Sequence, residues 1–284
     1  MKKTVADSQA PPIVPAFSCR GDENWLKQTI RSLQTAGYAV VLDVFDGERQ
    51  EQTGQALRRA ARALREDVGE ELLRSALELS IIRFLLKYEP FFFTLLELPQ
   101  MLCVVDGYLS PDAILRYQVG VILPAASQNL PEHRVMHHLH VNFRHIPNVP
   151  RLALDCVLLV TGLSTEAGGV EVFPGSHRRS TPPLSAEDLG KPVMITAPAG
   201  SMLVMDGALW HRELPNDSTS DKLYVTHQFA PPIVKPQIDL CASLGESTVR
   251  SLPDRTRRLL GWEARVPASP QDFYLPPERR LYQA

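Results

Sequence analysis

The sequence predicts an α+β domain with a mainly β core and helices in the N-terminal part of the chain. Three observations support this prediction. Apolar residues recur at helical spacing up to about residue 98, and from about residue 112 short apolar or alternating runs are separated by Pro, Gly, Asn and Ser. The second pattern, short runs separated by turn residues, is typical of a β-sandwich or barrel. No internal repeat and no low-complexity tract interrupts this order, so helices followed by strands indicate one α+β domain.

The first elements follow from periodicity and from capping residues. A helix is expected where four apolar residues recur at helical spacing: Trp25, Leu26, Ile30 and Leu33. Asp22 or Asn24 caps this helix, and Gly37 offers the left-handed conformation after its end. The run from Tyr38 to Phe45 then predicts a strand.

Helical spacing returns from about residue 50 to 98, and the stretch from Leu72 to Leu86 is richly apolar. These helices are expected to pack on the outside of a sheet. One more short helix is expected in the tail, over residues 245–262. Strands are expected over residues 113–123, 134–143, 152–161, 169–173, 192–197, 201–206 and 223–230.

Composition narrows the domain organisation and the partners. With 284 residues, of which 44% are hydrophobic, the chain is expected to form one domain over residues 21–284 after a flexible lead-in over residues 1–20. A formal net charge of −2 gives no electrostatic reason to expect nucleic acid or a membrane as partner. Small molecules are expected instead, and a homodimer is left open. Four well-separated cysteines and the lack of a membrane-length apolar run favour a cytoplasmic protein.

Five of the eight histidines lie between residues 133 and 145. Because side chains alternate across a strand, His138, His140 and Asn142 share one face while His137 takes the other. Imidazoles two residues apart on one strand can both reach a single metal ion. The alternative is that these histidines line the polar mouth or the surface of a barrel.

A second feature favours the metal site. The segment from Gly200 to His211 has the pattern of a tight turn, an apolar strand, a second turn and then a histidine. Together with the upstream cluster, His211 completes an arrangement typical of non-haem iron sites, in which two histidines and a third ligand leave the other positions open.

Four segments in order resemble the phytanoyl-CoA dioxygenase family of iron(II)- and 2-oxoglutarate-dependent oxygenases. They are residues 36–42, residues 166–177 with a Gly-rich turn and the motif Pro-Gly-Ser-His, residues 200–211 followed by Asn216, and the tail helix. The resemblance covers most of residues 30–262. It implies a double-stranded β-helix, the jelly-roll or cupin-like fold, with flanking N-terminal helices. It also implies Fe(II), 2-oxoglutarate and O₂ at the active centre.

The family's metal motif, His-x-Asp, is absent from the sequence, and three registers compete for its place. His140-Val-Asn142 is preferred, because its flanking residues and its distance from the Pro-Gly-Ser-His motif match the family. His138-Leu-His140 supplies a second histidine instead, and His137-His-Leu139 leaves no third protein ligand. Every register lacks the carboxylate, whose charge strengthens metal binding, so weaker binding or altered chemistry is expected.

The expected co-substrate site also departs from the family. Where the family has an arginine that binds the distal carboxylate of 2-oxoglutarate, this chain has Lys222. Lysine keeps the positive charge but lacks the planar guanidinium group that makes two parallel hydrogen bonds to a carboxylate. Gln118 and Thr226 on neighbouring strands, and His137, are further candidates for binding the co-substrate. The alternative for Lys222 is a solvated residue at a strand entry.

The resemblance thus implies a dioxygenase in which His140 and His211 are the catalytic iron ligands, with Asn142 or His138 near the third position. The expected reaction is hydroxylation, desaturation or a related C–H oxidation of a small, largely apolar metabolite, in a biosynthetic role. Two alternatives stay open. One is a metal-independent isomerase or lyase on the same fold that uses the histidines as acid and base, and the other is a non-catalytic partner subunit.

Overall fold

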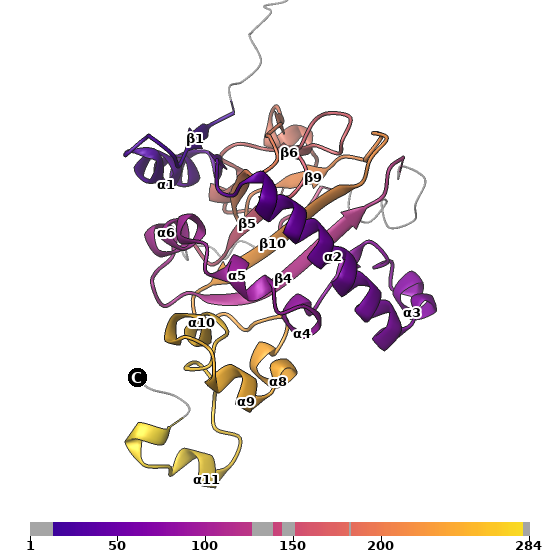
Figure 1. The fold of residues 1–284 in the computed structure, drawn as a ribbon. Helices are drawn as coiled ribbons and strands as arrows, with labels where there is room; N and C mark the ends of the chain where they lie inside the picture. The colour runs from indigo at the N-terminus through magenta and orange to yellow at the C-terminus, as the bar shows by residue number, and fades with distance from the viewer. Residues whose placement is uncertain (1–13, 127–138, 144–150, 182, 281–284) are drawn as a thin grey trace, which may run out of the picture.

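The computed structural model describes residues 14–126, 139–143, 151–181 and 183–280 (Figure 1). Within these residues the strands form two sheets. The seven strands of the large sheet, in spatial order, are β1 (Ala16–Ser18), β2 (Tyr38–Leu42), β8 (Met202–Asp206), β5 (Leu154–Leu159), β10 (Lys222–Ala230), β4 (Ile114–Leu123) and β3 (Ile81–Ile82). The three strands of the small sheet, in spatial order, are β7 (Val193–Ile195), β6 (Val170–Val172) and β9 (His211–Glu213).

Helices cover one face of the large sheet (Figure 1). Those before β4 are α1 (Trp25–Thr35), α2 (Gly47–Val68), α3 (Glu70–Ser75), α4 (Leu85–Tyr88), α5 (Phe92–Leu96) and α6 (Pro99–Tyr108). The helices after β10 are α8 (Leu240–Leu244), α9 (Glu246–Arg250), α10 (Asp254–Leu259) and α11 (Pro270–Phe273), and α11 lies away from the sheet with no buried residue (Figure 1). Short 3₁₀ turns lie at Ser176–Arg178, Glu187–Leu189 and Pro277–Arg279. None of the helices in the described part of the chain is both long and apolar enough to span a lipid bilayer.

Alternation along the strands divides the interior into two apolar layers. In β5, Leu154, Cys156 and Leu158 pack with the helices, whereas Val157 and Leu159 belong to the layer between the two sheets. The small sheet adds its own residues to this second layer: Val170, Val172, Val193 and Ile195. A strand covered on both faces is apolar along its length, which explains the composition of β5. The fold is therefore α+β with a mainly β core, in the order helices, large sheet, small sheet.

Most of the expected strands are confirmed. The structure has a strand at each expected range except one: 113–123, 152–161, 169–173, 192–197, 201–206 and 223–230. The strand expected over residues 134–143 lies mainly outside the described residues, and within it His140 forms an isolated bridge with His211. The short strands β1, β3 and β9 were not predicted, because two or three residues do not establish a period. β1 also brings Ala16–Ser18 into the sheet, within the lead-in that was expected to be flexible.

The helical prediction for residues 50–98 is wrong in one part. Leu77 and Phe84 have positive φ angles of 59° and 57°, and Ile81–Ile82 between them pairs with β4. Because a left-handed residue cannot continue a right-handed helix, the apolar run from Leu72 to Leu86 is not one helix. The tail over residues 245–262 likewise holds two short helices, α9 and α10, instead of one.

The end of α1 agrees with the prediction. Gly37 has a φ of 89°, and the N–H groups of Ala36 and Gly37 donate to the carbonyl oxygen of Ser32 at 2.7 and 3.1 Å. A Cβ atom at Gly37 would lie 2.5 Å from Nδ1 of His177. Glycine is therefore required here both by the left-handed conformation and by the close approach of His177.

Candidate active site

A cavity of about 370 Å³ lies between the two sheets. Most of its large-sheet wall consists of alternate residues of four strands: Tyr117, Val119 and Val121 of β4, Lys222, Tyr224 and Thr226 of β10, Val157 and Leu159 of β5, and Leu203 and Met205 of β8. The small sheet contributes Val170 of β6 together with His211 and Glu213 of β9. Most of this wall is apolar. Many of its polar side chains belong to three groups.

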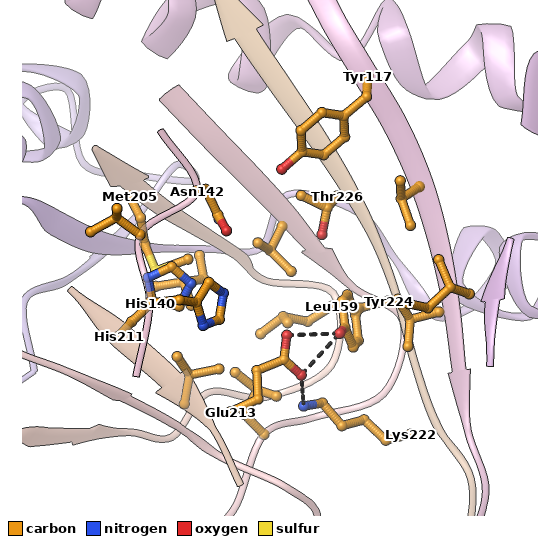
Figure 2. A pocket seen from close by; sticks show the side chains of 18 of the residues that line it. Tyr117, His140, Asn142, Leu159, Met205, His211, Glu213, Lys222, Tyr224 and Thr226 are labelled. Atoms are coloured by element: carbon orange, nitrogen blue, oxygen red, sulfur yellow. Dashed lines mark hydrogen bonds and ion pairs between the residues drawn. The ribbon is translucent and has the colours of Figure 1, made fainter. Parts of the chain in front are cut away.

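His140 and His211 lie side by side on the cavity wall (Figure 2). The backbone N–H group of each residue donates to the carbonyl oxygen of the other, at 3.0 Å in both directions. The segment around His140 therefore adds to the edge strand β9. The two ring centroids are 4.4 Å apart, and the ring planes are inclined by 54°. The structure thus brings together the two histidines that the sequence selects from distant segments.

The environment of His211 fixes its tautomer. Its Nδ1 atom lies 2.8 Å from the carbonyl oxygen of Leu209. Because a carbonyl only accepts hydrogen bonds, Nδ1 carries the proton and Nε2 keeps its lone pair. Burial, and secondly the neighbouring His140, lower the pKa of His211 to about 4, so the imidazole is neutral near pH 7. A neutral imidazole with a lone pair on Nε2 can act as a metal ligand or as a base.

Asn142 lies next to a buried polar row at one end of the cavity. In this row Tyr117, Gln228 and Asp155 occupy neighbouring positions on β4, β10 and β5. The Gln228 amide and the Tyr117 hydroxyl donate to Oδ1 of Asp155 at 2.9 and 3.3 Å. Burial raises the pKa of Asp155 to about 6, while hydrogen bonds from Gln228, Asn142 and Tyr117 limit the rise. A carboxyl group is therefore present beside Asn142, but it comes from β5 and not from the expected metal motif.

An ion pair lies at the other end of the cavity (Figure 2). The Lys222 ammonium donates to the carbonyl oxygen of Gly168 at 2.6 Å and to Oε2 of Glu213 at 3.3 Å. The Tyr224 hydroxyl lies 2.8 and 2.9 Å from the two carboxylate oxygens of Glu213. Burial alone would raise the pKa of Glu213, but the charge of Lys222 and the hydrogen bonds from Tyr224 and Lys222 together lower it. Lys222 is only 2% exposed, so its interpretation as a solvated residue is wrong.

The structure places the other candidates for binding the co-substrate on different faces of the large sheet. Thr226 of β10 lines the cavity, whereas Gln118 of β4 lies on the opposite face of the sheet. There its Nε2 atom is 2.8 Å from Nε2 of His227 and 3.4 Å from the carbonyl oxygen of Phe92. Since Tyr117 and Val119 face the cavity, alternation turns Gln118 toward the helices. His137 and His138 lie outside the described residues.

Sequence reasoning did not select Asp155, Tyr224 or Glu213 as site residues. Asp155 had a signal, because it is the one charged residue in the apolar run from Leu154 to Leu159, and a buried charge needs partners. Glu213 had a weaker signal, since it follows His211 by two residues and so shares its strand face. The contact of Tyr224 with Glu213 depends on how the two sheets face each other, and no local pattern predicts that.

Comparison with known families and proteins agrees with this architecture. Residues 33–223 match the family described as Phytanoyl-CoA dioxygenase (PhyH). An uncharacterised protein of Mycobacterium tuberculosis is 35% identical over 258 residues, which cover 91% of this chain and 94% of the relative. An uncharacterised protein of Mycobacterium bovis matches to the same extent.

Solved structures of non-haem enzymes share the fold. HygX from Streptomyces hygroscopicus, solved with iron bound, is 17% identical with a TM-score of 0.57, covering 77% of this chain and 93% of HygX. SnoN, a non-heme alpha-ketoglutarate-dependent epimerase from nogalamycin biosynthesis, is 14% identical with a TM-score of 0.58, covering 74% of this chain and 82% of SnoN. At these identities the likeness concerns the fold.

Proposed function

This chain belongs to the phytanoyl-CoA dioxygenase family, and we propose that it is a non-haem iron(II)- and 2-oxoglutarate-dependent dioxygenase. The proposed reaction is the hydroxylation, desaturation or related C–H oxidation of a small, largely apolar metabolite. The observation that carries the proposal is the pairing of His140 and His211 on the wall of the cavity. We also assign the two facing sheets to a double-stranded β-helix.

The donor set at this pair fits a metal ion. His211 is neutral, and its hydrogen bond to Leu209 fixes the ring so that Nε2 is the ligand atom. Asn142 lines the cavity two residues after His140, so its side-chain oxygen is our candidate for the third position. Because all three donors are neutral, we expect weaker metal binding than at a site with a carboxylate. Bound Fe(II) would supply the activation of O₂.

The remaining wall suits a small apolar substrate. Its apolar side chains include Val119, Val121, Val157, Leu159 and Leu163. A volume of about 370 Å³ lies within the range of roughly 300–1,000 Å³ that is usual for small-molecule sites. These side chains would exclude water from the reacting atoms, which protects a reactive oxidant from side reactions.

We assign the end of the cavity at Lys222 to 2-oxoglutarate. Lys222, Tyr224 and Thr226 come from one face of β10 and line the cavity together. An ammonium and a hydroxyl are the donors that a carboxylate needs for charge-assisted hydrogen bonds. In this assignment Lys222 binds the distal carboxylate, while the keto acid end of the molecule reaches toward the two histidines.

A metal-independent acid–base enzyme is the second candidate function. Two observations favour it: Asn142 stands where a ligand carboxylate is expected, and the neighbouring Asp155 has a pKa raised to about 6. A carboxyl group with such a pKa exchanges protons near neutral pH. His140 and His211 would then act on the substrate directly, and a chelator would leave the activity intact.

Anaerobic calorimetric titration of tag-free protein with Fe(II) tests the proposed function. We expect one ferrous ion to bind weakly to the wild type and not to the His140→Ala/His211→Ala variant. His227→Asn is the matched control, because His227 is a buried histidine on the face of β10 away from the cavity. Unchanged binding in the double variant would overturn the metal site.

Succinate formation from 2-oxoglutarate under O₂ then tests the oxygenase reaction. Conversion of a substrate without iron would favour the second candidate function, the metal-independent acid–base enzyme.

A further inference from the structure

We infer that the Glu213 carboxylate occupies an anion-binding position formed by Lys222 and Tyr224, so that a carboxylate ligand gains this position only by displacing Glu213. The inference rests on the proposed function only in naming 2-oxoglutarate as the ligand. Glu213 would thus act as an internal competitor of the co-substrate and set the concentration at which it binds.

The contacts of Glu213 are those of a bound carboxylate. One oxygen lies 3.3 Å from the Lys222 ammonium, and both oxygens lie within 2.9 Å of the Tyr224 hydroxyl. An ammonium and a hydroxyl converging on one carboxylate make the kind of site that recognises an anionic ligand. In this chain the ligand position is filled by a side chain of the protein itself.

The pair also joins the two walls of the cavity. Glu213 projects from β9 of the small sheet, whereas Lys222 and Tyr224 belong to β10 of the large sheet. Lys222 is held from a second side by the carbonyl oxygen of Gly168. Gly168 has a φ of 68°, and a Cβ atom there would lie 3.3 Å from Cδ of Lys222, so the glycine lets the backbone approach the lysine closely. The ammonium therefore keeps one hydrogen-bond partner, the carbonyl oxygen of Gly168, when Glu213 is displaced.

The second cation on the cavity wall is neutralised in the same way. Arg83 lines the cavity and binds both carboxylate oxygens of Glu78, with three contacts between 2.6 and 2.9 Å. Among the described residues of the wall, the lysine and the arginine are thus both paired with a glutamate. Adding an anionic ligand to such a wall would bury an uncompensated negative charge, which is costly. Exchange of Glu213 for the ligand avoids this cost when the displaced carboxylate, which is 20% exposed in the pair, turns outward into solvent and is hydrated there.

Two substitutions of Glu213 test the inference separately, one by removing its charge and the other by also creating space beside Lys222. Glu213→Gln removes the competing charge, and Glu213→Ala also opens a carboxylate-sized space beside Lys222. We expect Glu213→Gln to bind 2-oxoglutarate and glutarate at least about tenfold more tightly than the wild type in metal-free calorimetry, which corresponds to about 1.4 kcal/mol. Added acetate should raise the melting temperature of Glu213→Ala and leave that of the wild type unchanged.

Two further variants provide controls. Glu171→Gln removes a carboxylate from the ion pair with Arg212, on the face of β9 away from the cavity, and should bind both dicarboxylates as the wild type does. Adding Lys222→Met to Glu213→Gln should abolish the gain. If Glu213→Gln does not fold, the acetate response of Glu213→Ala still decides the question.

A merely structural ion pair gives the opposite results. Glu213→Gln would then be less stable but would bind neither dicarboxylate more tightly, and acetate would not stabilise Glu213→Ala. Either finding overturns the inference. None of these measurements uses metal or turnover. A failure of the iron titration would therefore contradict the oxygenase proposal without contradicting this inference.

Discussion

The ammonium of Lys222 on the large sheet lies 3.3 Å from the carboxylate of Glu213 on the small sheet, and the two side chains are 2% and 20% exposed. Removing one member of such a buried pair leaves the other charge uncompensated, which typically costs about 3–5 kcal/mol. Removing both members together avoids that penalty. The pair is therefore expected to show strong energetic coupling.

We predict that Lys222→Met lowers the free energy of unfolding by about 3–5 kcal/mol, and that Lys222→Met/Glu213→Gln lowers it by less than the sum of the two single changes. Urea denaturation of the four proteins gives the coupling energy as a double-mutant cycle. Additive losses would mean that the two groups do not interact in solution.

The second prediction concerns Asn142→Asp, which restores the carboxylate of the expected metal motif. The new carboxylate would lie beside Asp155, whose side chain accepts a hydrogen bond from Asn142. Like charges at short range disfavour ionisation of one partner, so the gain in Fe(II) affinity should be small in the single variant. In the Asp155→Asn background the gain should be about tenfold larger, as expected if about one pKa unit of repulsion is relieved.

Anaerobic titration of the wild type, both single variants and the double variant measures this difference. Asp155→Asn alone is the control, and it should change Fe(II) affinity little. An equal gain in both backgrounds would show that Asp155 does not influence residue 142. A gain in neither background would count against Asn142 as the residue at the third metal position.

These residues show what the sequence can and cannot predict. The strands β4, β5, β8 and β10 were predictable, because each is an apolar or alternating run bounded by turn residues. The sequence predicts that His140 and His211 belong to one site, but it does not predict their backbone pairing or the arrangement of their rings. Thr226 and Gln118 were equal candidates, and only the register, which pairs Thr226 with Val119, decides between them. The contact of Glu213 with Lys222 crosses two sheets, and neither sequence segment carries a pattern that specifies it.

The third prediction compares two glycines with positive φ. Gly37 has a φ of 89° and close neighbours, with a Cβ atom 2.5 Å from His177 and 2.7 Å from Leu209, whereas at Gly21, with a φ of 78°, a Cβ atom meets nothing within 4 Å. Gly21→Ala should cost about 1–2 kcal/mol from backbone strain alone. Gly37→Ala should cost about 1–3 kcal/mol more, because the methyl group is forced into a filled space.

Urea denaturation of both variants checks the difference. Gly37→Ala should also weaken Fe(II) binding, since Leu209 supplies the carbonyl that orients His211, while Gly21→Ala should leave it unchanged. Equal losses of stability in the two variants would mean that the space around residue 37 relaxes at little cost.

The last prediction concerns the pH dependence of stability through Asp155. Its pKa is raised from 3.8 to about 6, first because it is buried. Between these two values the folded protein keeps the proton while the unfolded chain releases it, so the free energy of unfolding falls as pH rises through this window. The full effect is about 3 kcal/mol, since each pKa unit corresponds to about 1.4 kcal/mol.

Asp155→Asn removes this contribution. Relative to the wild type, the variant should therefore gain about 2.4 kcal/mol of stability between pH 4 and pH 7, because part of the full effect lies outside this range. Urea denaturation at intervals across this range measures the gain, with the exposed Asp112→Asn as control. A difference between Asp155→Asn and the wild type that stays constant from pH 4 to pH 7 would show that Asp155 is ionised as readily in the folded protein as in the unfolded chain.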